Sequence, residues 1–179
     1  RDDQHAVIGT DAYFGGVVLK QHASVDPAKY YSGVLDLAKK IGVAVTDNCP
    51  ALGIRREGKA FVVTTPKGDI RAEKIVIATN GYTTSLVPWL QRRVIPIGTY
   101  MIATDPLPKA LMDKLFPTDR VASDTCKVIY YYRPSPDRSR ILFGGRVSAA
   151  ETNPAISGPR LHSDMCRSFP ELAGYAYTH

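Results

Sequence analysis

The segment from Lys74 to Thr84 constrains the fold of this chain more than any other. It opens with an unbroken apolar run over residues 75–78, which is typical of a strand buried on both faces of a sheet, and then turns abruptly to Thr79, Asn80 and Gly81. Ligands of open α/β sheets bind outside the carboxyl ends of such strands, and Asn-Gly tolerates the positive φ that lets a backbone approach a ligand closely. The segment therefore predicts a buried strand that ends at a ligand, or a buried strand followed by an ordinary turn.

A helix is expected over residues 27–41. Asp26 is a suitable N-cap, and Pro27 fits the first helical position. Apolar side chains then recur at helical spacing up to Ile41, and Gly42 suits the end of the helix. This apolar stripe predicts packing against a core rather than a binding face, because most surface helices carry one.

Strands are expected on both sides of that helix. Residues 13–19 combine aromatic and β-branched side chains around a glycine pair, and residues 43–45 form a short apolar run. Turn residues separate the apolar runs of residues 51–72, which predicts a three-stranded meander leading into the strand at residues 74–78.

The sequence changes character after Trp89. Residues 94–104 are extended in pattern but contain Pro96 and Gly98, which favour an edge or bulged strand. A short helix is expected over residues 109–115, strands over residues 127–133 and 140–147, and a further helix over residues 158–169.

Composition limits the classes of partner. The net charge is +6, but the basic residues are scattered in pairs without a recognition motif, so no nucleic-acid partner is expected. Cys49, Cys126 and Cys166 lie far apart, which argues against a disulfide framework or a zinc site and favours a reducing, cytoplasmic location. No apolar run approaches the roughly 20 residues of a membrane span, so no transmembrane segment is expected.

Tyr131 and Arg133 are candidate substrate-binding residues. Side chains alternate along a strand, so these two share one face while Tyr130 and Tyr132 share the other. An arginine among aromatic rings suits a carboxylate substrate, because its guanidinium group binds carboxylates in a bidentate manner. Aromatic packing between two layers, with the arginine at the rim, is an equally good interpretation.

The paired glycines of Phe143-Gly144-Gly145-Arg146 are a second candidate. Glycines weaken a strand, and one reason to keep them is the close passage of another group; a bulge is the alternative.

The run Ile-Val-Ile-Ala-Thr-Asn-Gly at residues 75–81 resembles the late nucleotide-binding motif of two-domain flavoproteins. The order of the surrounding segments narrows the resemblance to the D-amino-acid oxidase-like (DAO) family of FAD-dependent amine and amino-acid oxidoreductases, which includes glycine, sarcosine and gamma-glutamylputrescine oxidases. The resemblance covers nearly the whole chain and is greatest to the gamma-glutamylputrescine oxidase branch.

The resemblance implies a mixed α/β (α+β) fold that forms part of a two-domain flavoprotein. Residues 1–90 would form a partial, Rossmann-like FAD-binding layer with its β-meander, to which residues 11–25 belong unless they join the substrate domain. Residues 91–157 would supply the antiparallel strands of the substrate-domain sheet, and residues 158–179 a helix that returns toward the FAD-binding domain.

The resemblance also implies the cofactor-binding residues. Ala51 would contact the adenine of FAD, and residues 78–81 would lie beside the dinucleotide. Gly144 and Gly145 would pass near the isoalloxazine ring, where Arg146 would offset negative charge on the reduced flavin. It identifies no catalytic residue. The implied contacts are Ala51, Ala78, Thr79, Asn80, Gly81, Gly144, Gly145 and Arg146.

Two glycine-rich segments of the family are missing from the sequence, including the Gly-x-Gly-x-x-Gly fingerprint that cradles the FAD pyrophosphate. The chain therefore resembles an internal fragment, which is expected to be inactive or to bind FAD weakly. The full-length parent would oxidise the C–N bond of an amine or amino acid to an imine. The alternatives are a noncatalytic binding module with the same architecture and an NAD(P)H-linked reductase. Uncovered sheet edges and apolar patches predict self-association.

Overall fold

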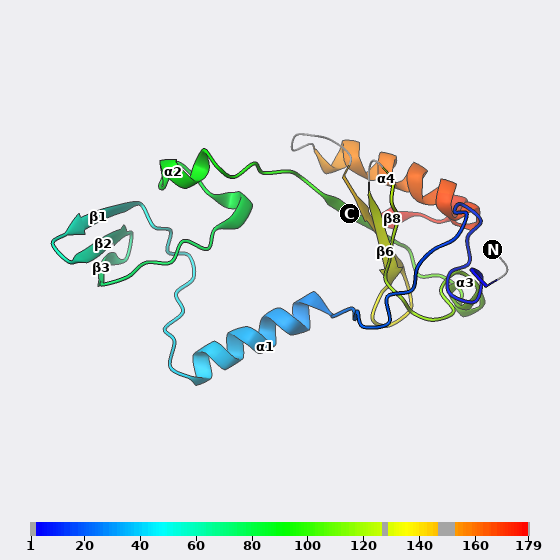
Figure 1. Cartoon of the computed structure of the whole chain (residues 1–179), viewed down its shortest axis with the longest axis horizontal. Coiled ribbons are helices and arrows are strands. Elements are labelled where there is room, and N and C mark those ends of the chain that lie inside the picture. The colour runs from blue at the N-terminus through cyan, green and yellow to red at the C-terminus, as the bar shows by residue number, and fades with distance from the viewer. Residues whose placement is uncertain (1–2, 127–128, 147–152, 179) are drawn as a thin grey trace. The chain divides into compact units, whose positions relative to one another are not determined.

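The computed structural model describes residues 3–126, 129–146 and 153–178 (Figure 1). The chain divides into two compact units, one formed by residues 1–26 with 97–179 and the other by residues 27–96. Each described unit contains one antiparallel sheet, so the fold is mixed α/β, as the sequence predicts.

The first unit is built around a five-stranded sheet with the strand order β5-β6-β7-β4-β8. Every neighbouring pair is antiparallel, and the β6–β7 hairpin forms its centre. Helix α4 packs on β4 and β7. The elements of this unit are β4 (Tyr100–Thr104), α3 (Lys109–Leu115), β5 (Ala122–Ser123), β6 (Tyr130–Pro134), β7 (Ile141–Gly145), α4 (Pro154–Ser168), the 3-10 helix η2 (Pro170–Gly174) and β8 (Tyr177–Thr178).

One face of this sheet carries the hydrophobic core. Tyr132 of β6 lies opposite Phe143 of β7, and their rings stack with centroids 5.5 Å apart and an interplanar angle of 5°. Phe169, just after α4, meets Tyr132 edge-on at 5.3 Å. Stacked and edge-on contacts of this kind add to the stabilisation from burial. The other buried apolar residues of this cluster are Ile102, Leu107, Met112, Leu115, Phe116, Ile141, Leu161, Met165 and Leu172.

The amino-terminal segment is held on this unit by polar contacts rather than by a strand. The backbone N–H of Gly9 donates to the carbonyl of Leu115 at 2.9 Å, and the buried hydroxyl of Thr10 donates to the carbonyl of Ser168. A Cβ at Gly9 would lie 2.2 Å from the carbonyl oxygen of Lys114, so only glycine allows this approach. The strand predicted over residues 13–19 is not formed, since no strand among the described residues pairs with this segment.

The second unit contains the predicted meander as a three-stranded sheet in the order β1-β2-β3. The predicted helix is also confirmed, to within one residue of its end, although none of its side chains is buried. Its apolar stripe therefore does not pack against a core in this structure, contrary to expectation. The elements are α1 (Pro27–Lys40), β1 (Gly53–Glu57), β2 (Ala60–Thr65), β3 (Gly68–Ala72), η1 (Asn80–Tyr82) and α2 (Pro88–Gln91).

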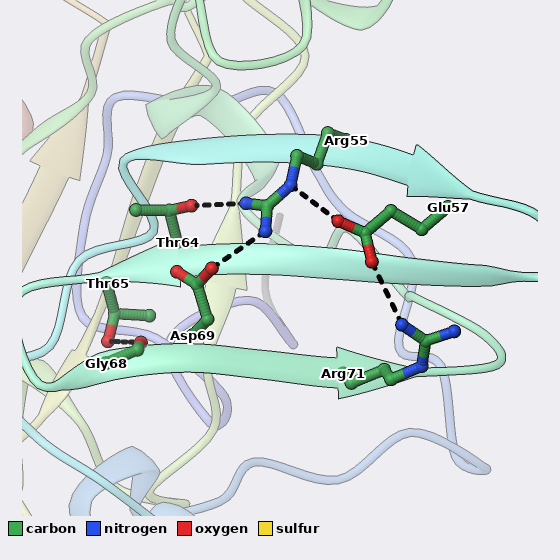
Figure 2. Close-up of polar contacts among 7 residues, drawn as sticks. All are labelled: Arg55, Glu57, Thr64, Thr65, Gly68, Asp69 and Arg71. Carbon is green, nitrogen blue, oxygen red and sulfur yellow. Dashed lines mark hydrogen bonds and ion pairs between the residues drawn. The ribbon is translucent and has the colours of Figure 1, made fainter.

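An ion-pair network covers one face of the meander (Figure 2). Arg55 lies between Glu57 and Asp69, with nitrogen–oxygen distances of 3.0 and 2.9 Å, and also donates to the hydroxyl of Thr64. Arg71 completes the network through Glu57 at 2.9 Å. The hydrogen bond from Arg55 lowers the pKa of Asp69. Alternation along the strands places Ile54, Val63 and Ile70 together on the opposite face of the meander.

Two buried strands predicted in this unit are not formed. Residues 43–45 and 74–78 form neither strand nor helix and pair with no strand of the described chain, and Val76 is 87% exposed. A parallel strand is held by ladders to its neighbours and by layers on both faces, and an apolar run cannot supply these contacts itself.

The remaining elements of the first unit differ from prediction mainly in their ends. The helix expected over residues 109–115 is confirmed. The extended segment predicted over residues 94–104 forms a strand only over its last five residues, as β4. Of the strands predicted over residues 127–133 and 140–147, β6 and β7 are present, while residues 127, 128 and 147 lie outside the described residues.

Helix α4 begins four residues before the predicted start at Gly158. The side chain of Asn153 accepts a hydrogen bond from the N–H of Ala155 at 2.9 Å, and Pro154 occupies the first helical position. With this cap the helix begins at Pro154, so Pro159 lies inside it. No helix among the described residues is both long and apolar enough to cross a membrane.

Phe143→Ala tests the aromatic core. Removing this fully buried ring should lower the free energy of unfolding by about 3–5 kcal/mol, because the truncation leaves a cavity between Tyr132 and its neighbours. Urea denaturation followed by circular dichroism would measure the loss. Phe14→Ala is the matched control, since that ring is 92% exposed, and it should change stability by less than about 0.5 kcal/mol. Equal losses in the two variants would contradict the proposed core.

Candidate functional site

An apolar hollow of about 210 Å³ lies on the apolar face of the meander. Ile54 and Val63 line it from β1 and β2, and the segments 75–79 and 83–87 line the rest together with Ala51. Ala51 precedes the meander in the sequence, and Ala78 and Thr79 follow it. The fold therefore brings these three predicted cofactor contacts together around one hollow. The sequence did not indicate Ile54 and Val63 as site residues, and their position on one face follows from the register in which they pair.

Asn80, which is exposed, and Gly81, which is half-buried, form the turn beside this hollow. Asn80 adopts φ 48°, the positive value that the sequence predicts for this turn. The hydroxyl of Thr83 donates to the carbonyl of Asn80 at 2.7 Å and lies 2.8 Å from the hydroxyl of Thr79. Thr83 thus braces the turn. Sequence reasoning missed this residue, although a threonine three positions after a turn asparagine is well placed to hydrogen-bond the local backbone.

Tyr131 and Arg133 lie on the face of β6 that turns away from the core. Tyr132 between them is buried and Tyr130 packs against the core, which confirms the predicted alternation. Arg133 donates from Nη1 to the carbonyl of Val25 at 2.7 Å. It lines a second hollow, of about 240 Å³, together with polar residues of the β6–β7 turn and of residues 24–26.

The glycines of β7 make room for the tyrosine rings of β6. A Cβ at Gly144 would lie 2.2 Å from Cε2 of Tyr131, and a Cβ at Gly145 would lie 2.6 Å from Cδ1 of Tyr130. Pairing with β6 is regular from Ile141 to Gly145, so this segment contains no bulge. The group that passes closely is thus a neighbouring ring, while contact with a flavin stays a prediction. Arg146 follows β7 and is exposed.

A chain of hydroxyl groups links the amino-terminal segment to the core. Tyr132 hydrogen-bonds to Tyr13, whose hydroxyl donates to Oδ2 of Asp124 at 3.4 Å. Oδ1 of the same carboxylate accepts the N–H of Tyr130 at 3.0 Å. Burial raises the pKa of Tyr13 and, together with the hydrogen bond to Tyr13, that of Tyr132. Both phenols are therefore neutral structural groups.

Tyr130 makes a similar contact with α4. Its hydroxyl donates to Oδ2 of Asp164 at 2.7 Å. Burial and this carboxylate raise the pKa of Tyr130 to about 12, so it too stays protonated. No group of three or more His, Cys, Asp or Glu side chains in the described part of the chain is placed to hold a metal ion.

Comparison with known proteins identifies the family. The model of the DAO family, described as FAD dependent oxidoreductase, matches residues 2–179. The chain belongs to the DAO family. This result confirms the resemblance drawn from the segment order and from residues 75–81.

The DAO relatives include proteins of several bacteria. A probable oxidoreductase OrdL of Rhizobium meliloti (strain 1021) is 30% identical over the whole chain, which spans 41% of that protein. Gamma-glutamylputrescine oxidoreductase of Escherichia coli (strain K12) is 28% identical over 93% of the chain and 39% of its own length. Glycine oxidase of Bacillus subtilis (strain 168) is 29% identical over 37% of the chain and 18% of its own length. The chain thus spans about two fifths of the length of the first two relatives.

Gly144→Ala tests the fit between β7 and Tyr131. The added methyl group must displace the ring, so the free energy of unfolding should fall by about 1–3 kcal/mol. Thermal and urea denaturation would measure the loss. Gly16→Ala is the control, because its Cβ would meet nothing within 4 Å.

Combining Gly144→Ala with Tyr131→Ala separates a packing effect from an effect on the backbone. If the clash is the cause, the glycine substitution should cost much less in the absence of the ring, and the pair should be strongly non-additive. Additive losses would show that Gly144 is needed for another reason.

Proposed function

We propose that this chain supplies the cofactor-contacting and substrate-facing parts of a longer FAD-dependent oxidoreductase, which oxidises the C–N bond of an amine or amino acid to an imine. The observation that supports this most is the apolar hollow, where Ala51, Ala78 and Thr79 meet. All three are among the cofactor contacts that the family resemblance implies. The DAO family is FAD-dependent, so a cofactor site is expected somewhere in such an enzyme.

The hollow suits one end of the cofactor rather than the whole. Its volume of about 210 Å³ is below the roughly 300–1,000 Å³ of pockets that enclose a drug-sized ligand. Its apolar lining suits the faces of a flat heteroaromatic ring, and the hydroxyls of Thr79, Thr83 and Thr84 supply polar contacts at its edge. We therefore assign it to the adenine of FAD, with the turn at Asn80 and Gly81 beside the rest of the dinucleotide.

The two units would have different roles, one in binding FAD and the other in binding the substrate. We assign residues 27–96 to the FAD-binding side and the five-stranded sheet to the substrate side, with residues 1–26 joined to the latter. Bound flavin would accept the hydride equivalent that leaves the carbon beside the nitrogen. The chain's own residues would orient the substrate. Because Tyr130 and Tyr132 face the core, Tyr131 and Arg133 would face the substrate.

Arg133 would bind a carboxylate group of the substrate. Its Nη1 already donates to the carbonyl of Val25, which holds the guanidinium group in place and leaves its other N–H groups for an anion. Arg146 would offset negative charge on the reduced flavin, and Gly144 and Gly145 would pass near its ring. The relatives named for gamma-glutamylputrescine and for glycine support an amine or amino-acid substrate.

FAD titration of the purified chain tests the cofactor site. Weak, saturable quenching of flavin fluorescence is expected, because the hollow can hold only one end of the cofactor. Ala78→Trp should abolish the quenching by filling the hollow. Ala110→Trp is the control, since Ala110 is an exposed residue of α3 in the other unit, and it should bind as the unchanged chain does. Equal binding by both variants would place the flavin elsewhere.

Turnover requires a polypeptide that carries this sequence within a full-length DAO protein. Such a protein, incubated with a panel of amines and amino acids, should reduce its flavin and release the carbonyl product of imine hydrolysis. The 179-residue chain alone should show no turnover with added FAD. Flavin that stays oxidised with every substrate in the full-length protein would favour a noncatalytic binding module.

A further inference from the structure

The turn beside the apolar hollow contains the one Asn-Gly pair of the sequence, Asn80 and Gly81. The other two asparagines precede Cys49 and Pro154. In an Asn-Gly pair the following backbone nitrogen can attack the side-chain amide, because glycine has no Cβ to hinder the approach. A proline nitrogen carries no proton to lose and cannot react in this way.

The structure leaves this pair open to that reaction. Asn80 is exposed and Gly81 is half-buried, and a Cβ at Gly81 would meet nothing within 4 Å, so no side chain or backbone atom blocks that side of Gly81. Among the described residues no hydrogen bond is made by the N–H of Gly81, whereas the next N–H, of Tyr82, donates to Thr79 at 3.0 Å. Within the described residues the nucleophilic nitrogen is therefore not held by a hydrogen-bond acceptor.

We propose that Asn80 is a site of spontaneous deamidation. The N–H of Gly81 loses its proton to solvent base, and its nitrogen forms a bond to Cγ of Asn80. The bond from Cγ to Nδ2 breaks, and Nδ2 leaves as ammonia, which gives a five-membered succinimide. Water then opens this ring at Cγ to leave aspartate, or at the main-chain carbonyl to leave isoaspartate.

Thr83 sets the rate of this step. Its hydroxyl and its N–H donate to the carbonyl of Asn80 at 2.7 and 3.3 Å, so they hold the peptide that must rotate before the ring can close. Thr79 supports the same hydroxyl at 2.8 Å. Deamidation thus proceeds from the fraction of molecules in which this brace is open.

The modification would act on the cofactor site, and this consequence rests on the proposed function. Either product adds a negative charge at the turn assigned to the dinucleotide, and isoaspartate also lengthens the main chain by one carbon. The new carboxylate would repel the pyrophosphate of FAD. Deamidation at Asn80 would therefore weaken FAD binding as the protein ages.

Incubation of the chain in mildly alkaline buffer, followed by peptide mass spectrometry, tests the proposal. A gain of about 1 Da should accumulate on the peptide containing Asn80, part of it as isoaspartate detectable by an isoaspartyl methyltransferase. Asn48 is an internal control, because it is also exposed and adopts nearly the same φ, 47° against 48°, but precedes cysteine. Its peptide should gain mass several-fold more slowly. Equal rates at the two sites, or no gain at Asn80, would overturn the proposal.

Two variants test the mechanism. Gly81→Ala should slow the reaction several-fold without disturbing the turn, since the methyl group has room. Thr83→Val should accelerate it, because the 2.7 Å hydrogen bond to Asn80 is lost. A rate unaffected by both changes would exclude attack by the Gly81 nitrogen.

Added FAD separates this inference from the proposed function. If FAD binds beside the turn, a saturating concentration should slow the mass gain at Asn80 and leave Asn48 unchanged. Deamidation that FAD does not affect would count against the cofactor assignment alone, while the modification site itself would stand.

Discussion

The stack of Tyr132 on Phe143 is the contact on which the five-stranded unit depends. It joins the two central strands, receives the edge of Phe169 from the end of α4, and through the hydroxyl of Tyr132 reaches Tyr13 of the amino-terminal segment. Once Tyr132 is committed to the core, alternation along β6 leaves Tyr131 and Arg133 on the opposite face. The packing of one face therefore decides which side chains lie on the other face, where we propose that the substrate binds.

The glycine pair of β7 follows from the same alternation. Two neighbouring strand residues point to opposite faces, so Gly144 accommodates Tyr131 on one side of the sheet and Gly145 accommodates Tyr130 on the other. Cross-strand pairing of glycine with an aromatic ring covers backbone that a glycine would otherwise expose. This explains why two residues with low strand propensity stand in a regular ladder, at the carboxyl end of β7.

Local patterns predicted much of the structure, and non-local contacts account for what they missed. The helix after Asp26, the meander and the positive φ of Asn80 depend on residues close in sequence, and all three were predicted. The runs at residues 43–45 and 74–78 have strand-like composition, but a strand also needs a neighbour, which composition does not supply. Only the family resemblance indicated that Ala51 and Ala78 belong to one site, because nothing in the two residues themselves indicates that they lie close together. The cross-strand fit of Tyr131 to Gly144 required the register of β6 and β7, which sequence alone does not give.

The ligand contact and the deamidation that we propose for the turn after Ala78 would depend on the same properties of its residues. A backbone that approaches a ligand closely needs a residue tolerant of positive φ, a neighbour without a Cβ and N–H groups that the fold leaves unpaired. The same three properties let a backbone nitrogen reach an adjacent side-chain amide. Asn80 and Gly81 have all three properties together. Thr83 slows the attack on the side-chain amide by holding the carbonyl of Asn80. Any change that makes the backbone of such a turn more accessible to a ligand therefore also favours succinimide formation. The hydrogen bonds of Thr83 set the balance between ligand access and resistance to deamidation.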